Sequence, residues 1–295
     1  MGKTVYFDIN VFGHIMGSGN GPVSRKQIEI LEQLLKNGKL SIILSYLNLD
    51  EAIAAAKDSP QKATELVSII FKYADDNKIV RELPNLLRKD IERWAIRKRR
   101  SPFAQDPKLK RALEDLKNGK WDTKELQETA GETDQQKKDN ATAIIQGFEN
   151  AKAEVGAEFN RKTLIHASFE NFWKSSVNDY LNILLESAEK HKRLSDQTRT
   201  TIRKRGELRL LKIPSVLVGV GYEISYIYAK TYEAQPGEVK ARRDINYDHH
   251  HAMLATAADI FVTHDKTLTR ILKRIPNLPY EVLSLSELCS RFASE

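Results

Sequence analysis

The spacing of hydrophobic and polar residues divides the chain into two outer segments with short strands and a helical middle. In the first outer segment, a β-rich run begins within 3–12 and has Asp8 at its end, and a continuous apolar run at 40–45 predicts a buried strand. A third short strand is expected at 78–83. Apolar residues at helical spacing predict helices at 24–39, 46–57 and 61–76.

The second outer segment begins at 213, where hydrophobicity returns after the charged middle. Pro214 is typical of a helix start, because proline is tolerated in the first helical turn. Strands are expected at 259–264 and 280–284, and helices at 247–258, 267–275 and 284–292. Between about 84 and 213 no convincing strand pattern occurs, and 169–185 is the clearest amphipathic helix.

Strands that alternate with helices are typical of a parallel α/β sheet, and both outer segments show this alternation. The helical middle is therefore interpreted as an insertion into one α/β domain. The expected division is a first half at 1–82, a basic all-helical insertion at 83–212, and a second half at 213–295.

Composition narrows the class of protein. The chain has 295 residues, 41% of them hydrophobic, which is enough for a large core. Its one cysteine, Cys289, excludes a disulfide framework or a cysteine-based zinc site within one chain. The longest apolar run, 216–222, is far shorter than the ~20 residues that span a bilayer, so a cytoplasmic protein without a membrane segment is expected. The net charge of +7 favours a polyanionic partner such as nucleic acid.

Four carboxylates from distant parts of the chain are expected to meet at one edge of the sheet. Asp8 ends the first strand, Glu51 follows the second, and Asp265 lies just past "DIFVTH". Asp248 opens the helix before that strand. Functional groups gather at the carboxyl ends of parallel strands, and converging carboxylates repel each other without a cation. Oxygen ligands suit hard ions, so the sequence predicts a site for Mg²⁺ or Mn²⁺.

Two of these acids have a neighbouring competitor. Asp50 precedes Glu51 and is also explained as an acid in an early helical turn, where the helix dipole favours it. Asp244 lies one turn before Asp248 and is interpreted as a supporting acid or a helix cap. Asp259 precedes its strand at the opposite end and is expected to be a turn residue.

The three consecutive histidines do not form a zinc site. Successive residues on a helix point about 100° apart, so His249, His250 and His251 cannot all bind one ion. His251 is expected to face inward near the carboxylates, with the other two on the surface. His264, in "THD", is expected to be a bystander.

Taken together, "VYFDINVF", "SYLNLDEA" and "YDHHHAMLATAADIFVTHD" resemble the PIN-domain nuclease family. The resemblance covers 1–82 and 213–295, and implies an α/β/α PIN-like fold with a large all-helical insertion. It also implies an endoribonuclease in which a metal-activated water cuts the phosphodiester, leaving a 5′-phosphate and a 3′-hydroxyl. The implied catalytic and metal-binding residues are Asp8, Glu51, Asp248 and Asp265. Asn10 would orient Asp8, and Thr263 would support the site.

Basic residues cluster in the predicted insertion, at "RKRR" and in "RTTIRKRGELR". Each run alone is explained by a solvated helix face, but together they are suited to phosphate contacts. The predicted nucleic-acid contacts, with RNA favoured, are Arg97, Lys98, Arg99, Arg100, Arg203, Lys204 and Arg205.

Two other functions are compatible with the same sequence. One is a structure-specific DNA nuclease of the flap-nuclease type, in which the basic helices would form an arch over a single strand. The other is a non-catalytic module that binds nucleic acid or protein. The sequence leaves open a regulatory partner protein and an oligomer.

Overall fold

The structure is a computed structural model, and it describes residues 2–17, 23–54, 59–99, 101–104, 115, 117–118, 168–191, 194–233 and 245–293. Two predicted functional residues, Asp244 and Arg100, lie outside these ranges. So does most of the predicted insertion between 105 and 167. Within the described residues, no helix combines the length and the apolar character that a membrane span needs.

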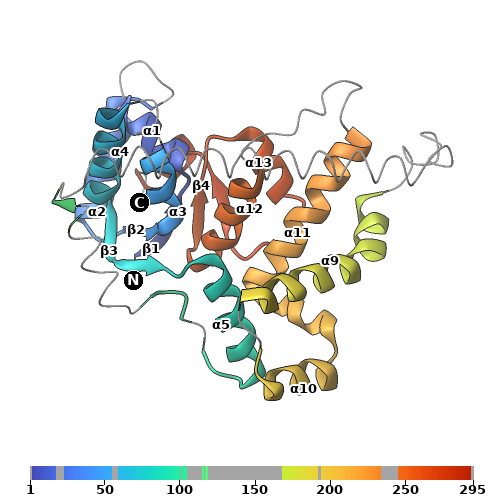
Figure 1. Cartoon of the computed structure of the whole chain (residues 1–295). Coiled ribbons are helices and arrows are strands. Elements are labelled where there is room, and N and C mark those ends of the chain that lie inside the picture. The colour runs from blue at the N-terminus through green and yellow to red at the C-terminus, as the bar shows by residue number, and fades with distance from the viewer. Residues whose placement is uncertain are drawn as a thin grey trace.

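The protein is a mixed α/β structure around a five-stranded sheet in which every neighbouring pair of strands is parallel (Figure 1). The strand order is β3-β2-β1-β4-β5. The strands are β1 (Lys3–Phe7), β2 (Leu40–Ser45), β3 (Ala74–Val80), β4 (Ile260–Val262) and β5 (Glu281–Leu283).

The strand order places the two halves of the chain side by side at the centre of the sheet. From β1, the order runs outward to β2 and β3 on one side and to β4 and β5 on the other. Tyr6 of β1 is opposite Phe261 of β4. The chain therefore reverses its direction across the sheet between β1 and β4, and open parallel sheets bind ligands at the carboxyl ends of the strands at such a point.

The first face of the sheet is covered by helices that pack on Val5 and Phe7 of β1. The chain enters one of them, α2, through Ser24, whose hydroxyl and backbone form a capping box with Gln27. These helices share one apolar core with the strands. They are α1 (Ile9–Met16), α2 (Arg25–Lys36), α4 (Pro60–Tyr73) and α14 (Leu285–Ala293).

The second face is covered by helices from the middle and the end of the chain. Tyr6, Ile43 and Phe261 point from the strands into this second core. The predicted insertion and the second outer segment therefore bury their apolar residues together. The helices are α5 (Leu83–Ala95), α9 (Phe169–His191), α10 (Asp196–Arg205), η3 (Glu207–Lys212), α11 (Pro214–Tyr228), η4 (Ala229–Glu233), α12 (Ile245–Leu254), η5 (Ala255–Ala257) and α13 (Lys266–Leu272).

The remaining described helix, α3 (Tyr46–Ala54), follows β2 directly and has side chains in contact with both cores. It therefore lies at the edge where the strands end. This layering is compatible with the α/β/α arrangement expected from the sequence. The division into a domain and an insertion stays a prediction.

The structure differs from the predicted elements around β3 and after Asp8. The helix expected at 61–76 ends at Tyr73, because β3 begins at Ala74. The third strand was expected at 78–83 but runs from Ala74 to Val80, because its first half is polar and pairs at the sheet edge through a register shift beside Ile43 and Leu44. Its predicted end instead enters α5, which has a proline in its first turn. Helix α1, directly after Asp8, was not predicted.

Two helical glycines should respond in opposite ways to the same substitution. A Cβ atom on Gly221 of α11 would lie 2.7 Å from Cγ2 of the buried Ile275, whereas a Cβ on Gly13 of α1 would meet nothing within 4 Å. Gly13→Ala should raise the free energy of unfolding by about 0.5–1 kcal/mol, because alanine loses less chain entropy on folding. Gly221→Ala should lower it by about 1–3 kcal/mol through overpacking. Urea denaturation measures both, and a gain at both positions would contradict the packing of α11 on Ile275.

Candidate functional site

Three functional groups from three elements meet at the carboxyl ends of the central strands. Asp8 directly follows β1, Glu51 lies on α3, and His251 lies on α12. Nε2 of His251 lies 2.6 Å from Oε2 of Glu51 and 3.9 Å from Oδ1 of Asp8. One ligand atom from each residue lies within 4.8 Å of the others. Asp8 and His251 are only 4% and 1% exposed, so the cluster is largely removed from solvent.

The Asp8 carboxylate is held in place by its two predicted supporting residues. Its Oδ2 atom accepts hydrogen bonds from Nδ2 of Asn10 at 2.6 Å and from the Thr263 hydroxyl at 2.7 Å. The backbone N–H of Asp8 donates to the carbonyl of Val262, which ties the end of β1 to the end of β4. Since both donors bind Oδ2, the Oδ1 atom is directed toward His251.

Asp265 is fixed at the start of α13. Its Oδ1 atom accepts hydrogen bonds from the backbone N–H groups of Thr267 and Leu268, at 2.7 and 2.9 Å, which is an N-cap arrangement. Its own N–H donates to the Thr263 hydroxyl that holds Asp8. One threonine therefore connects both aspartates of the β1–β4 edge.

A relay of hydrogen bonds fixes the protonation of His251. Nδ2 of Asn48 donates to the Phe7 carbonyl, so its Oδ1 atom accepts from the Ser45 hydroxyl. Ser45 has one hydroxyl proton and donates it in the hydrogen bond to Asn48. The hydrogen bond between Ser45 and Tyr6 must therefore be donated by the Tyr6 hydroxyl. Tyr6 then accepts from Nδ1 of His251, 2.7 Å away.

The other ring nitrogen of His251, Nε2, faces the Glu51 carboxylate, which accepts a hydrogen bond when ionised. Both nitrogens therefore donate, and His251 is an imidazolium between two carboxylates. Loss of the Nε2 proton alone would leave the Nδ1–H tautomer, since the relay holds the other proton. That tautomer presents the Nε2 lone pair to the centre of the cluster, as a metal-ligating histidine does.

The electrostatic interactions agree with this assignment. Burial lowers the pKa of His251, but the carboxylates of Glu51, Asp8 and Asp248 together raise it above its ordinary value of 6.5. Burial raises the pKa of Asp8. The His251 ring opposes that increase, and the charges of Glu51 and Asp265 add to it. All four predicted acids are thus close enough to interact with Asp8 or His251.

The donor set fits a divalent cation. Two carboxylates and one imidazole nitrogen would hold it, namely those of Asp8, Glu51 and His251. Carboxylates suit Mg²⁺ and Mn²⁺, and an imidazole ligand suits transition metals, so the cluster fits Mn²⁺ better than Mg²⁺. Asp248 and Asp265 are not among the three groups that lie closest, and they contribute negative charge around them.

Glu51, and not its competitor Asp50, faces this cluster. Asp50 is exposed and lines a separate hollow beside α3. Asp259 lies at the opposite end of the sheet, as predicted, where its Oδ2 atom accepts from the backbone and side chain of Thr4 at the start of β1.

The prediction for the other two histidines was wrong. His249 and His250 are half-buried and line the same hollow as Asp50. The His249 ring stacks on buried Tyr222, with ring centroids 4.9 Å apart, and its Nδ1 atom lies 2.9 Å from Oε1 of Glu223. Burial, with the neighbouring histidines, lowers the pKa of His250 to about 4. Because α12 packs along α11, less of its surface is exposed to solvent than the sequence suggested.

Sequence reasoning missed the residues of the relay. It expected His251 to face inward near the carboxylates, as the structure has it, but as a supporting residue and not as a member of the cluster. Tyr6, Ser45 and Asn48 occur in apolar strand or early-helix contexts, with no motif that marks them. The available signal was a serine at the end of a buried strand, since a buried hydroxyl needs a partner. The His264 ring contacts His14, with ring centroids 4.8 Å apart, and its backbone N–H donates to Oδ1 of Asn10.

Comparison of the chain with protein-family models, curated proteins and solved structures found no match. A function for this protein must therefore be inferred from the geometry of the cluster and its surroundings.

The protein should lose stability as the pH rises above neutrality in a chelating buffer. The pKa of His251 is raised in the folded protein, so between 6.5 and that higher value the folded state binds more protons than the unfolded chain. The stabilisation is complete below about pH 6.5 and disappears as the pH rises through the folded pKa. The melting temperature should fall by about 3 °C for each kcal/mol lost.

Differential scanning calorimetry between about pH 6 and pH 9 measures this slope. His251→Gln should flatten it, and so should Glu51→Gln, because the Glu51 carboxylate is the strongest of the charges that raise the pKa. An unchanged slope in both variants would assign it to another group.

Proposed function

We propose that the protein is a divalent-metal-dependent nuclease, and specifically a PIN-like endoribonuclease. The observation that supports this proposal best is the buried cluster of Asp8, Glu51 and His251 at the point where the strand order reverses. A bound Mg²⁺ or Mn²⁺ supplies Lewis acidity, which activates water and neutralises the charge that develops on a phosphodiester.

The residues of the chain have separate tasks in this proposal. Asp8, Glu51 and His251 would hold the cation, and Asn10 and Thr263, which both donate to Oδ2 of Asp8, leave its Oδ1 atom available for it. The Tyr6–Ser45–Asn48 relay keeps the proton on Nδ1 of His251, so that Nε2 is the ligating atom. Asp248 and Asp265 surround this group with negative charge, which favours binding of a divalent cation.

A basic hollow beside the C-terminal end of α5 is suited to a polyanionic substrate. It has a volume of about 670 Å³ and no acidic residue among those that line it. Three of the predicted contacts line it, and Arg209 adds a fourth cation. The lining residues are Arg97, Gln197, Thr200, Thr201, Lys204, Arg205 and Arg209.

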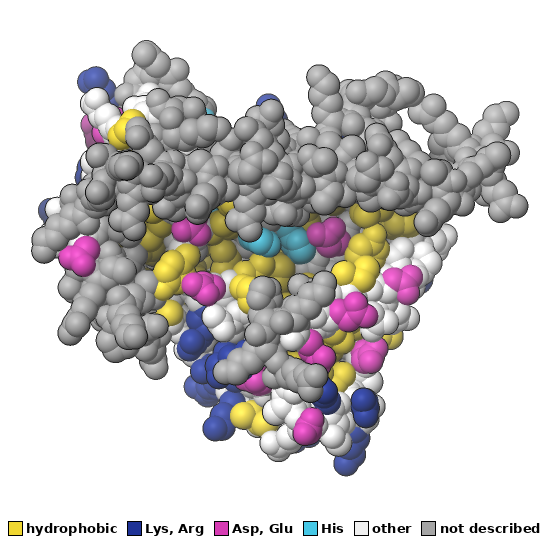
Figure 2. All heavy atoms as spheres, viewed as in Figure 1, with side chains coloured by type: hydrophobic (Ala, Val, Ile, Leu, Met, Phe, Trp, Pro, Cys, Tyr) yellow, Lys and Arg dark blue, Asp and Glu magenta, His cyan; other side chains and the backbone are white. Residues whose placement is uncertain are grey.

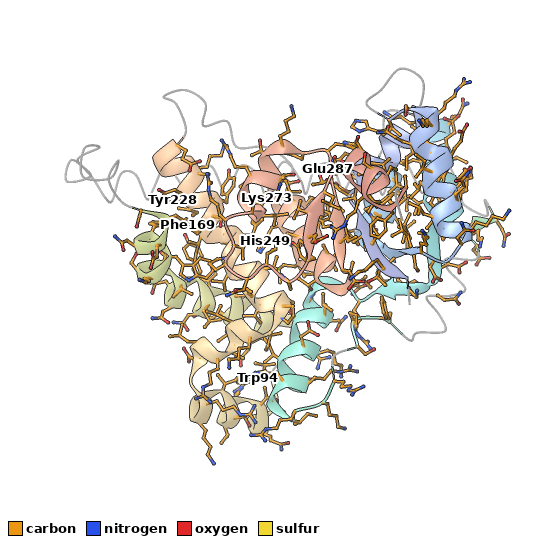
Figure 3. All side chains as sticks on the ribbon, turned by 180° about the vertical axis from the view of Figure 1, so that it is seen from behind. Trp94, Phe169, Tyr228, His249, Lys273 and Glu287 are labelled. Carbon is orange, nitrogen blue, oxygen red and sulfur yellow. The ribbon has the colours of Figure 1, made fainter. Side chains whose placement is uncertain are left out.

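One wall of this basic hollow is rigid. The Arg205 guanidinium lies 4.9 Å from the centre of the Trp94 ring and donates to the Trp94 carbonyl. Trp94 lies near the end of α5, beside α10 (Figure 3). A positioned guanidinium is suited to phosphate oxygens. In the face shown in Figure 2, lysine and arginine side chains gather on the same side of the protein as a group of histidine and acidic side chains.

Cleavage should require the cation, and the loss of either the Asp265 or the Glu51 carboxylate should slow it. With labelled single-stranded RNA in Mn²⁺, the protein should release internal fragments, and EDTA should stop the reaction. Asp265→Asn should reduce the rate about 10²–10³-fold, the loss typical of removing one electrostatic stabiliser. Asparagine caps helices as well as aspartate does, so α13 should be retained. Glu51→Gln should show a similar loss and weaker Mn²⁺ binding by calorimetry.

Asp259→Asn is the matched control, because it removes a carboxylate at the opposite end of β4. It should leave the rate unchanged. Faster cleavage of matched DNA would replace RNA by DNA as the substrate. Absence of cleavage and of Mn²⁺ binding in the parent protein would overturn the nuclease proposal.

The basic hollow should determine the salt dependence of binding. Lys204→Gln and Arg209→Gln each remove one exposed cation from it. The slope of log affinity against log salt for single-stranded RNA should become less steep by about 0.7 for each phosphate that the variant no longer neutralises. Fluorescence anisotropy at several salt concentrations measures it. Lys26→Gln, on α2, is the charge-matched control, and an equal change there would indicate only a net-charge effect.

A further inference from the structure

A second hollow, which we call the α5–α9 pocket, lies beside the acid–histidine cluster. Its volume is about 580 Å³, within the range of ~300–1,000 Å³ typical of small-molecule sites. Apolar side chains form most of its walls, and tyrosines contribute from α3 and α9. Those walls include Tyr46, Leu47, Leu87, Tyr180, Leu184 and Met253.

The pocket and the cluster share two helices. On α3, Asp50 lines the pocket while Glu51 faces the cluster, and on α12 His250 lines the pocket while His251 faces the cluster. Neighbouring residues on a helix point about 100° apart, so the two sites occupy adjacent faces of the same pair of helices.

The charges around the pocket exclude a phosphate as its occupant. Its lining includes three acidic residues, Asp50, Glu82 and Glu223. The basic side chains in the lining are Arg81 and the histidines, of which His249 contacts Glu223. This balance gives no positive surplus, in contrast to the basic hollow. Apolar walls, aromatic rings and a few polar groups instead suit a flat, uncharged ring with hydrogen-bonding edges. Figure 2 shows the mixture: histidines beside acidic side chains, within a hydrophobic surround.

The two hollows lie at opposite ends of α5. Arg81 and Glu82 precede the helix and line the α5–α9 pocket, whereas Arg97 follows it and lines the basic hollow. The pocket lining extends along the helix to Leu87, so at 1.5 Å a residue the two linings are roughly 15–20 Å apart. At ~3.4 Å per stacked nucleotide, a strand of about five or six nucleotides covers that distance.

We propose that the α5–α9 pocket binds one nucleobase of single-stranded RNA, next to the phosphodiester on which the acid–histidine cluster acts. This inference rests on the proposed nuclease function for the identity of the strand. The base leaves its stack and enters the pocket, while the chain continues along α5 to the basic hollow. Recognition of splayed-out bases by aromatic and apolar pockets is typical of single-stranded RNA binding.

The test uses labelled RNAs of about eight nucleotides, long enough to follow α5, each with one abasic position. Affinity is measured by anisotropy in EDTA, which prevents cleavage and makes the result independent of the metal. One abasic position should weaken binding to the parent protein about tenfold, the effect of losing one stacked base. The other positions should change it much less.

Ile183→Trp should fill the pocket from a position that is 60% exposed, so folding is preserved. It should weaken binding of intact RNA by a similar factor, and the sensitive abasic position should then cost nothing more. Leu208→Trp is the matched control, because Leu208 is 52% exposed and does not line the pocket. It should behave like the parent.

Equal loss at every abasic position, or losses that add to that of Ile183→Trp, would overturn the base-pocket proposal. Cleavage with no sensitive position would leave the nuclease proposal standing without the pocket. A sensitive position in a protein that neither cleaves nor binds Mn²⁺ would support the pocket as a base-binding site and overturn the nuclease.

Discussion

The site depends on the balance of buried charge around His251. Two carboxylates, those of Asp8 and Glu51, approach each other where little water reaches them, and an isolated buried charge of this kind is costly. The imidazolium ring between them offsets that cost, with Nε2 directed at Glu51 and Nδ1 at Tyr6. Because His251 comes from α12, more than 200 residues after Asp8, the folded chain must close β4 against β1 before this balance exists.

The same balance explains how one arrangement suits both a proton and a metal ion. The Nδ1 proton of His251 is held by a relay that ends at the Phe7 carbonyl, whereas the Nε2 proton faces carboxylates that a cation also prefers. In the proposed function, a divalent cation and the Nε2 proton would therefore compete for one place among the same acids. The fold provides negative charge in excess of one imidazolium, since Asp248 and Asp265 also act on the cluster.

The sequence was sufficient for the parts of the site that follow from strand ends. Asp8 and Asp265 could be predicted to meet because their strands are parallel and end at one edge. Whether Glu51 or Asp50 joins the cluster depended on which side of α3 faces that edge, and sequence spacing favoured Glu51 without deciding it. The relay could not be predicted, because its hydrogen bonds join residues 39 and 245 positions apart. The polar half of β3 was missed for a related reason, since its strand geometry comes from pairing with β2.

Helices α5 and α9 are connected to the site through the second core, which they share with Tyr6. Tyr6 carries its hydroxyl to His251 and its ring into the core that includes Leu86 and Leu181. Those two residues belong to α5 and α9, which also line the α5–α9 pocket. Tight packing transmits small displacements, because a close-packed interior has little free volume to absorb them. A ligand that moves α5 or α9 should therefore displace the Tyr6 ring, and through the Tyr6 hydroxyl the hydrogen bond to Nδ1 of His251.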